Sequence, residues 1–359
     1  MFLLLKGHHM SLNDSKVAPG IPSFIVSTQR RAPEVQTIIA AKNAPTISFY
    51  FCGGTGINTY NRVSMLLPES AHIQIFDTAD KSNRIDTNID VTILTPAAVG
   101  SGGDRNENSR TIAAALSEVD HVNEDIAFVV FGKSGGSGSV IGPLWAKELH
   151  RRDQSIRIIG IAIADHESSQ QHSDNMKGAT KSLISICEKN GISIPLIIYD
   201  NKYGRNIVDK EVTNLFKMFL QIFTTQINEI DPSDFLNFIA HKSTTPGIKC
   251  LNVRCTNSNE IVSSAIQEDS DVYESILTII GSTDAESEFK QVSATRSFSG
   301  IFESPDFPSI RLAISEFSSK FEELAKETED HLNSLKQAKA AQNKASVWKV
   351  SGDEDDLIS

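Results

Sequence analysis

The chain has 359 residues and a formal net charge of −11, and 40% of its residues are hydrophobic and 22% charged. This composition is ordinary for a globular protein with a sizeable core, and the length predicts about two domains. The negative charge argues against a general nucleic-acid binder, and no apolar run approaches the roughly 18 residues that a membrane span requires. The cysteines lack any CxxC spacing, which predicts buried thiols in a reducing cytoplasm for Cys52, Cys187, Cys250 and Cys255.

Residues 1–44 are predicted to be an N-terminal extension broken by prolines, in which Gly7-His8-His9-Met10 could be a cloning remnant. After it, short apolar patterns typical of strands alternate with helical patterns. This alternation predicts an α/β fold with a doubly wound parallel sheet over 45–206. The expected strands are 46–52, 72–76, 91–94, 126–131, 156–164 and 194–199. One expected helix ends at 67, and the others span 106–119, 140–152 and 173–190.

Three glycine-rich segments follow strands of this sheet. Their residues are Gly53, Gly54, Thr55, Gly56 and Asn58 in the first, Gly100, Ser101, Gly102 and Gly103 in the second, and Gly135, Gly136, Ser137, Gly138 and Ser139 in the third. A glycine-rich turn between a strand and a helix points backbone N–H groups at an anion. Because ligands bind at the carboxyl edge of such sheets, three segments there predict a ligand with several phosphates. An acid after the second strand, Asp77 or Asp80, could bind a ribose or cap a turn.

The central segment, residues 126–143, is open to other interpretations. A Walker A loop is rejected because it needs glycine where the chain has Ala127. The stretch 132–136 satisfies the G-x-S-x-G pattern of a hydrolase, with Ser134 as the nucleophile. The acid and base candidates for such a serine hydrolase are Asp165, His172 and His241. A non-catalytic nucleotide-binding assembly factor is another alternative.

A long central helix is predicted over 207–230, with an apolar face broad enough for a helix covered on most sides. Three acids lie at its end, Glu229, Asp231 and Asp234. Asp231 suits the N-cap of the next helix, with Pro232 at the first helical position. A cap alone does not explain the clustering of three acids.

The C-terminal part is predicted to hold a smaller α/β domain, a long helix and an acidic tail. The domain covers 231–306, with strand patterns at 249–255, 275–280 and 291–298. Residues 307–350 are expected to form mostly one helix. Its first half is amphipathic through Ile310, Leu312, Ile314, Phe317, Phe321 and Leu324. The tail, 351–359, contains a helix-stopping glycine, Gly352, ahead of its acids.

The third glycine segment resembles the GGTGSG loop of the tubulin and FtsZ superfamily, with Ser137 in place of threonine. The order of elements over 45–350 is most similar to the phage-encoded, PhuZ-type branch. The resemblance implies a tubulin/FtsZ-like fold in which the glycine segments cradle the phosphates of GTP or GDP, accompanied by Mg²⁺. We expect no metal site built from side chains alone. The resemblance also implies that Asn201 contacts guanine, and that Asp209 accepts hydrogen bonds from guanine N1–H and N2–H₂.

In this superfamily an N-x-D-x-x-D motif follows the central helix, and it matches Asp231 and Asp234, with Glu229 where asparagine is usual. The resemblance implies a GTPase that works as a polymer, because these acids face the γ-phosphate and the attacking water of the adjacent subunit. Its implied role is to position phage DNA in the cytoplasm of the infected bacterial cell. A plasmid-partition, TubZ-like filament is the alternative.

The acidic tail is expected to grip the next subunit of such a filament. Its nine residues can extend roughly 30 Å, at about 3.3–3.6 Å per residue. The acids of the tail are Asp353, Glu354, Asp355 and Asp356. Their expected partners form a basic cluster on the helix after the central segment, namely Lys147, Arg151 and Arg152. A solvated tail that only aids solubility is the alternative.

Overall fold

The computed structural model describes residues 45–317, with gaps, and four isolated positions beyond them. The gaps are 86–88, 96–99, 121, 166–168, 225–226, 241–244, 257–264, 266–269, 271, 282–288, 290–291 and 303–308, and the isolated positions are 333, 334, 337 and 341. The predicted extension 1–44, the acidic tail 351–359 and nearly all of the predicted helix beyond 317 lie outside the described residues.

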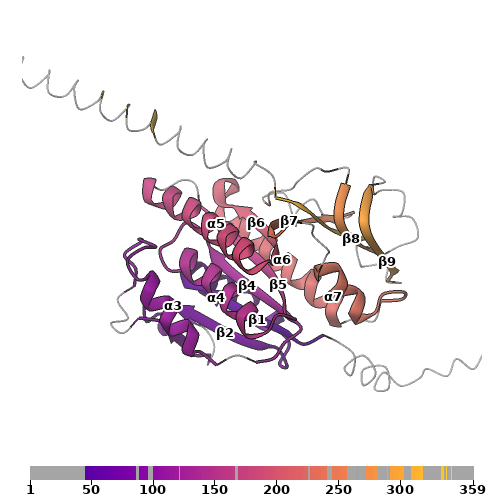
Figure 1. Cartoon of the computed structure of the whole chain (residues 1–359), viewed down its shortest axis with the longest axis horizontal. Helices are drawn as coiled ribbons and strands as arrows, with labels where there is room; N and C mark the ends of the chain where they lie inside the picture. The colour runs from indigo at the N-terminus through magenta and orange to yellow at the C-terminus, as the bar shows by residue number, and fades with distance from the viewer. Residues whose placement is uncertain are drawn as a thin grey trace, which may run out of the picture. The chain divides into compact units, whose positions relative to one another are not determined.

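A ten-stranded sheet in the order β3-β2-β1-β4-β5-β6-β7-β10-β8-β9 organises the described chain (Figure 1). The strands from β3 to β7 in this order pair in parallel, as the alternating sequence pattern predicts, whereas β10 is antiparallel to both of its neighbours. The strands are β1 Ile47–Cys52, β2 His72–Asp77, β3 Val91–Ile93, β4 Ile126–Gly132, β5 Arg157–Ala164, β6 Ser193–Asp200, β7 Gly247–Cys255, β8 Val272–Ile280, β9 Ser293–Ile301 and β10 Ile310–Glu316.

Helices cover both faces of the parallel part, so the predicted doubly wound architecture is confirmed. Helices α3, α4 and α5 contribute to the hydrophobic cluster on one face, and α2, α6 and α7 contribute to the cluster on the other. The helices are α2 Gly53–Val63, α3 Ser109–Glu118, α4 Gly138–Arg152, α5 Gln170–Asn190, α6 Arg205–Thr224 and α7 Pro232–Ala240. None of the helices in the described ranges is long and apolar enough to cross a membrane.

The central helix α6 packs as its sequence pattern predicts. Its ring contacts with the sheet include Phe216 against Phe49 at 5.6 Å and Phe219 against Phe128 at 5.2 Å between ring centroids. The apolar positions of the predicted face are all buried, namely Val208, Val212, Leu215, Phe216, Phe219, Leu220, Phe223 and Ile227. Burying each such side chain contributes about 1.5–3 kcal/mol, so this face holds α6 firmly on β1 and β4.

Residues 310–316 form strand β10, which corrects the prediction of mostly one helix over 307–350. Ile310 and Ile314 are four residues apart, which fits one face of a helix, but Leu312 between them gives the two-residue period of a strand. All three side chains are buried. The segment pairs with β7 on one side and β8 on the other. Two hydrogen-bonded ladders therefore decide in favour of the strand.

Candidate functional site

The sheet order brings the three glycine segments to one edge. β1 lies between β2 and β4, so the strand order reverses there. In open α/β sheets the crevice outside the carboxyl ends at such a reversal is the usual ligand site. The first segment follows β1, the third follows β4, and the second follows β3, two strands away. We call the place where they meet the glycine junction, defined as residues 53–54, 100–103 and 135–139.

Glycine is required where these segments touch one another. A Cβ built on Gly53, whose φ is +73°, would lie 2.6 Å from the backbone nitrogen of Gly138. A Cβ on Gly136 would lie 2.9 Å from the carbonyl carbon of Gly103 and 2.9 Å from the Cβ of Ser101. The third segment is therefore in backbone contact with both of the others, at separations that a side chain would prevent.

Two helices begin at the glycine junction with no side chain capping them. Helix α2 begins at Gly53, so the first segment forms its first turns, and the loop that the sequence predicts there is wrong. Helix α4 begins at Gly138. The N-cap residues Cys52 and Ser137 make no side-chain hydrogen bond to either helix, whereas Ser169 caps α5. The first N–H groups of α2 and α4 are therefore donors that suit an anion.

The other predicted residues of the three segments have varied surroundings. Gly56 packs α2 against its strand, because a Cβ there would lie 2.6 Å from the carbonyl carbon of Phe51. Asn58 is exposed on the second turn of α2, and Ser139 is buried. Gly135 has no atom within 4 Å of its Cβ position. Three glycines of the second segment adopt positive φ values, Gly100, Gly102 and Gly103.

The segment after β2 joins the glycine junction, which the glycine pattern does not reveal. The hydroxyl of Thr78 forms a hydrogen bond with that of Ser137 at 2.6 Å and with that of Ser101 at 3.3 Å. This hydroxyl therefore links the second and third segments. The signal in the sequence is only a threonine directly after a predicted strand.

Lys81 brings a positive charge to the start of α2. Its ammonium group donates to the buried Asp77 carboxylate at 2.6 Å, and it lies 3.3 Å from the position of a Cβ on Gly54. Asp77 also accepts the N–H of Thr78 at 2.7 Å. The turn-capping alternative for Asp77 is therefore favoured over ribose binding, because its carboxylate holds the turn and the lysine.

Asn201 lies at the same sheet edge, directly after β6. It opens a short 3-10 turn, Asn201–Tyr203, which leads through Gly204 into α6. Tyr203 and Ile207 are 49% and 48% exposed, and the Lys202 ammonium lies 5.2 Å from the centroid of the Tyr203 ring. A stacking surface beside an amide is the combination that recognises a nucleic-acid base.

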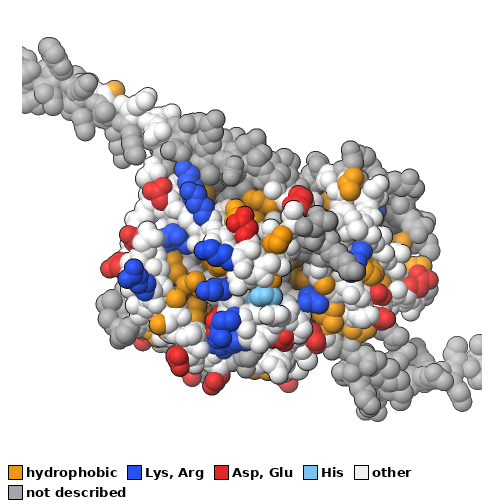
Figure 2. Space-filling view, viewed as in Figure 1, with side chains coloured by type: hydrophobic (Ala, Val, Ile, Leu, Met, Phe, Trp, Pro, Cys, Tyr) orange, Lys and Arg blue, Asp and Glu red, His pale blue; other side chains and the backbone are white. Residues whose placement is uncertain are grey.

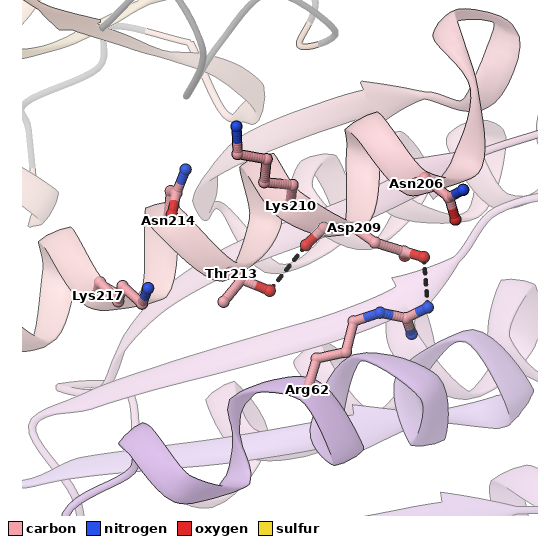
Figure 3. A pocket seen from close by; sticks show the side chains of 7 residues that line it. All are labelled: Arg62, Asn206, Asp209, Lys210, Thr213, Asn214 and Lys217. Atoms are coloured by element: carbon pink, nitrogen blue, oxygen red, sulfur yellow. Dashed lines mark hydrogen bonds and ion pairs between the residues drawn. The ribbon is translucent and has the colours of Figure 1, made fainter. Parts of the chain in front are cut away.

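Asp209 lies in a groove of about 390 Å³ between α2 and α6 (Figure 3). Its carboxylate pairs at 2.5 Å with Arg62. Arg62 lies in the last turn of α2, whereas the first glycine segment forms the first turns of that helix. Burial raises the pKa of Asp209, and the charges of Arg62 and Arg205 oppose that shift. A guanine base would therefore compete with Arg62 for this carboxylate. The groove is also lined by Asn206, Lys210, Thr213, Asn214 and Lys217.

Ser134 is buried, and its hydroxyl accepts the backbone N–H of Asp165 at 2.6 Å. The Asp165 carboxylate pairs with Arg205 at 2.7 Å. A serine nucleophile instead needs an accessible hydroxyl that donates to a base. The described contacts therefore give Ser134 a structural role, and His241 of the hydrolase alternative lies outside the described residues.

Asp231 and Asp234 cap helix α7 reciprocally. Oδ1 of Asp231 accepts the N–H groups of Ser233 at 2.7 Å and Asp234 at 3.1 Å, and Oδ2 of Asp234 accepts the N–H of Asp231 at 3.0 Å. This is a capping-box arrangement, so capping accounts for both aspartates. Hydrogen bonds from the Ser233 hydroxyl and the Asp234 N–H lower the pKa of Asp231, which keeps it a carboxylate at neutral pH.

Glu229 and the two aspartates lie at the far end of α6 from the glycine junction. Helix α6 begins next to Asn201 and runs for 20 residues, which span roughly 30 Å. Glu229 is exposed and has a φ of +70°, the one positive φ of a non-glycine residue in the described ranges. Asparagine adopts this conformation more readily than glutamate, which gives a backbone reason for the usual asparagine there.

The basic cluster expected on α4 is only partly available to a partner. The Arg152 side chain is 11% exposed and donates to Glu148 at 2.7 Å. It also donates to carbonyl oxygens that end α3, those of Leu116, Ser117 and Val119. Arg152 therefore caps α3, and its predicted place in an exposed cluster is wrong. Arg151 is 58% exposed and Lys147 is exposed, and Figure 2 shows basic side chains over the region of α3, α4 and α5.

Known proteins resemble the chain in sequence and in fold, although no family model matches it. A phage tubulin-like protein of Pseudomonas phage 201phi2-1 is 25% identical over 232 residues, which are 62% of this chain and 71% of that protein. A protofilament of TubZ from bacteriophage PhiKZ has a TM-score of 0.69 at 19% identity, over 81% of this chain and 92% of that one. The phage tubulin PhuZ with GDP has a TM-score of 0.64 at 21% identity, over 82% and 93%. In sequence and in fold, the chain is similar to proteins of the phage-encoded branch of the tubulin/FtsZ superfamily.

Proposed function

We propose that the chain is a GTP-binding and GTP-hydrolysing cytoskeletal protein that assembles into filaments. The observation that carries the proposal is the glycine junction, which gathers backbone N–H groups, hydroxyls and two uncapped helix N-termini. Such donors suit the oxygens of a polyphosphate. The similar structures described as a GDP complex and as a protofilament support the guanine nucleotide and the self-association, respectively.

The base is proposed to bind at the turn between β6 and α6. Asn201 presents an amide to the base edge, and Tyr203 or Ile207 presents a surface to its face. Asp209 remains the proposed reader of guanine N1–H and N2–H₂, and its carboxylate pairs with Arg62. These contacts would favour GTP over ATP, because adenine lacks both donors at those positions.

Hydrolysis is proposed to take place between subunits. Asp231 and Asp234 lie roughly 30 Å along α6 from the edge that holds the glycine junction, so they cannot reach phosphates bound in their own subunit. Stacked head to tail, one subunit would present them to the nucleotide of the next. Since Asp231 keeps its charge, it would accept a hydrogen bond from the attacking water and orient it. Carboxylates within one binding site would repel the triphosphate.

Mg²⁺ is proposed to accompany the nucleotide and to offset its charge. The described residues contain no group of three or more His, Cys, Asp or Glu side chains that could hold a metal ion. Beside a nucleotide, Mg²⁺ is held mostly by phosphate oxygens and water, with one or two carboxylates at most.

The acidic tail, 351–359, is proposed to contact Lys147 and Arg151 of the next subunit, without Arg152. Replacing Arg151 by Ala is expected to weaken assembly and to leave the free energy of unfolding close to the wild-type value, because exposed ion pairs contribute little. Replacing Arg152 by Ala is expected to lower the free energy of unfolding by about 2–3 kcal/mol, because it removes charged hydrogen bonds at the end of α3. Chemical denaturation and pelleting assays distinguish the two, and equal stability of both variants would refute the capping role.

The cellular role follows from the resemblance alone. The proposed filament positions phage DNA in the cytoplasm of an infected bacterium, and a TubZ-like plasmid-partition filament is the alternative. Imaging a fluorescently tagged chain together with stained DNA during infection would test this role.

The proposed activity is tested by phosphate release from GTP measured against protein concentration, with electron microscopy of the same samples. We expect release to rise steeply above a threshold concentration at which filaments appear. A fluorescent GTP analogue should be displaced by GTP at concentrations at which ATP has no effect. Equal displacement by ATP would contradict the guanine preference, and release that stays first order in protein below the threshold would contradict hydrolysis between subunits.

A further inference from the structure

Helix α5 presents a row of small and polar residues toward the glycine junction. Asn175, Gly178 and Ser182 are spaced at i, i+3 and i+7, which places them on one face of the helix. This helix packs beside α4 (Figure 1). Asn175 forms hydrogen bonds with Gly103 of the second glycine segment and with Ser134, which precedes the third. Ser182 forms one with Arg105, two residues after the second segment.

The Asn175 side chain joins the second segment to the third. Its amide nitrogen donates to the carbonyl oxygen of Gly103 at 2.7 Å and to that of Ser134 at 2.8 Å. Its amide oxygen accepts the N–H of Arg105 at 3.4 Å. Asn175 is only 2% exposed, so water cannot readily replace these bonds. One buried amide therefore holds three backbone groups from the turns that follow β3 and β4.

Arg105 makes a second connection on the same face of α5. Its guanidinium donates to the Ser182 hydroxyl at 2.9 Å and to the carbonyl oxygen of Ser139, in the first turn of α4, at 3.4 Å. It lies against Gly178, where a Cβ would come within 2.6 Å of a guanidinium nitrogen. The missing side chain at Gly178 thus leaves the space in which Arg105 reaches α4.

We infer that Asn175, with Arg105 seated against Gly178, positions the second and third glycine segments for binding the nucleotide phosphates. The inference rests on the proposed function and adds residues outside the glycine segments to it. Donors bind a polyanion well when they are fixed before it arrives, because no reorganisation is then needed. Backbone N–H groups in glycine-rich turns are not fixed by their own side chains. Hydrogen bonds from a buried side chain on a long helix supply that constraint.

The test compares Asn175→Ala with Asn190→Ala, which alters the same residue type on the same helix. The Asn190 amide donates to the Ile186 carbonyl at 2.7 Å, at the other end of α5 from Asn175. We expect Asn175→Ala to weaken GTP binding by about 10- to 100-fold, and Asn190→Ala to leave it unchanged. Competition by guanosine, which has no phosphates, should change by less than about twofold in both variants. A merely structural role would weaken guanosine and GTP alike.

Gly178→Ala provides a second variant in which folding is expected to survive. Alanine favours a helix interior, and the Cβ displaces only the flexible end of Arg105. We expect weaker GTP binding, unchanged guanosine competition and an undiminished melting temperature. If the wild-type chain binds GTP and both variants match it, the inference is overturned. If the wild-type chain does not bind GTP, the proposed function itself fails.

Discussion

Replacing Asp234 by Asn is expected to slow GTP hydrolysis in filaments by about 100- to 1,000-fold, as for the loss of a positioned acid–base group. Asparagine keeps a carbonyl oxygen that can accept the N–H of Asp231, so the cap of α7 survives while the negative charge is lost. GTP affinity and melting temperature should therefore stay near the wild-type values. Phosphate release, nucleotide binding and thermal unfolding of one preparation measure these quantities.

The control for this prediction separates capping from hydrolysis. Asp234→Ala removes both the charge and the capping oxygen, so it should lose about 1 kcal/mol of stability in addition to activity. An Asp234→Asn variant that hydrolyses GTP at the wild-type rate would assign this aspartate to capping alone.

A mixing experiment tests whether the acids act on the adjacent subunit. A Gly136→Ala subunit should keep its acids but bind nucleotide only weakly, and an Asp234→Asn subunit should bind nucleotide but lack the acid. In mixed filaments the acids of a Gly136→Ala subunit would face the GTP bound to an Asp234→Asn subunit. The mixture should therefore hydrolyse GTP faster than either variant does alone. The absence of any gain in filaments shown by microscopy to contain both variants would count against hydrolysis between subunits.

Replacing Gly136 by Ala is expected to weaken GTP binding by about 100-fold or more. A Cβ there would lie 2.9 Å from the carbonyl carbon of Gly103 and 3.0 Å from the backbone nitrogen of Asp104. Because the atoms in the way are backbone, the second and third segments would have to separate, and a displacement of about 1 Å in a binding site can cost about 100-fold. Titration with a fluorescent GTP analogue measures the loss.

Gly135→Ala is the matched control for this prediction. The two glycines are adjacent, yet Gly135 has no atom within 4 Å of its Cβ position and no positive φ. The control should therefore keep the glycine segments in contact, and it should lose much less GTP affinity than Gly136→Ala does. Equal affinity in the two variants would show that contact between the glycine segments does not govern binding. Circular dichroism of both confirms that the sheet is intact.

Much of the fold is predictable from the sequence because its signals are local. Buried parallel strands are continuous apolar runs such as 126–131, and α6 shows its apolar face over 20 residues. The glycine segments stand out by composition, and parallel strands place them on one edge whatever the order of the strands. The sequence by itself thus determined the doubly wound sheet, the central helix and the three segments of the junction.

Side-chain pairing across elements was decided only by the tertiary structure. Residues 310–316 became a strand because β7 and β8 offer ladders on both sides, a long-range effect that outweighs an ambiguous local period. Asp209 meets Arg62, and Asn175 reaches Gly103 and Ser134, through partners that are at least 41 residues away along the chain. Their distance in sequence leaves no periodic or compositional signal. Such contacts exist only once the sheet has brought the helices and turns together.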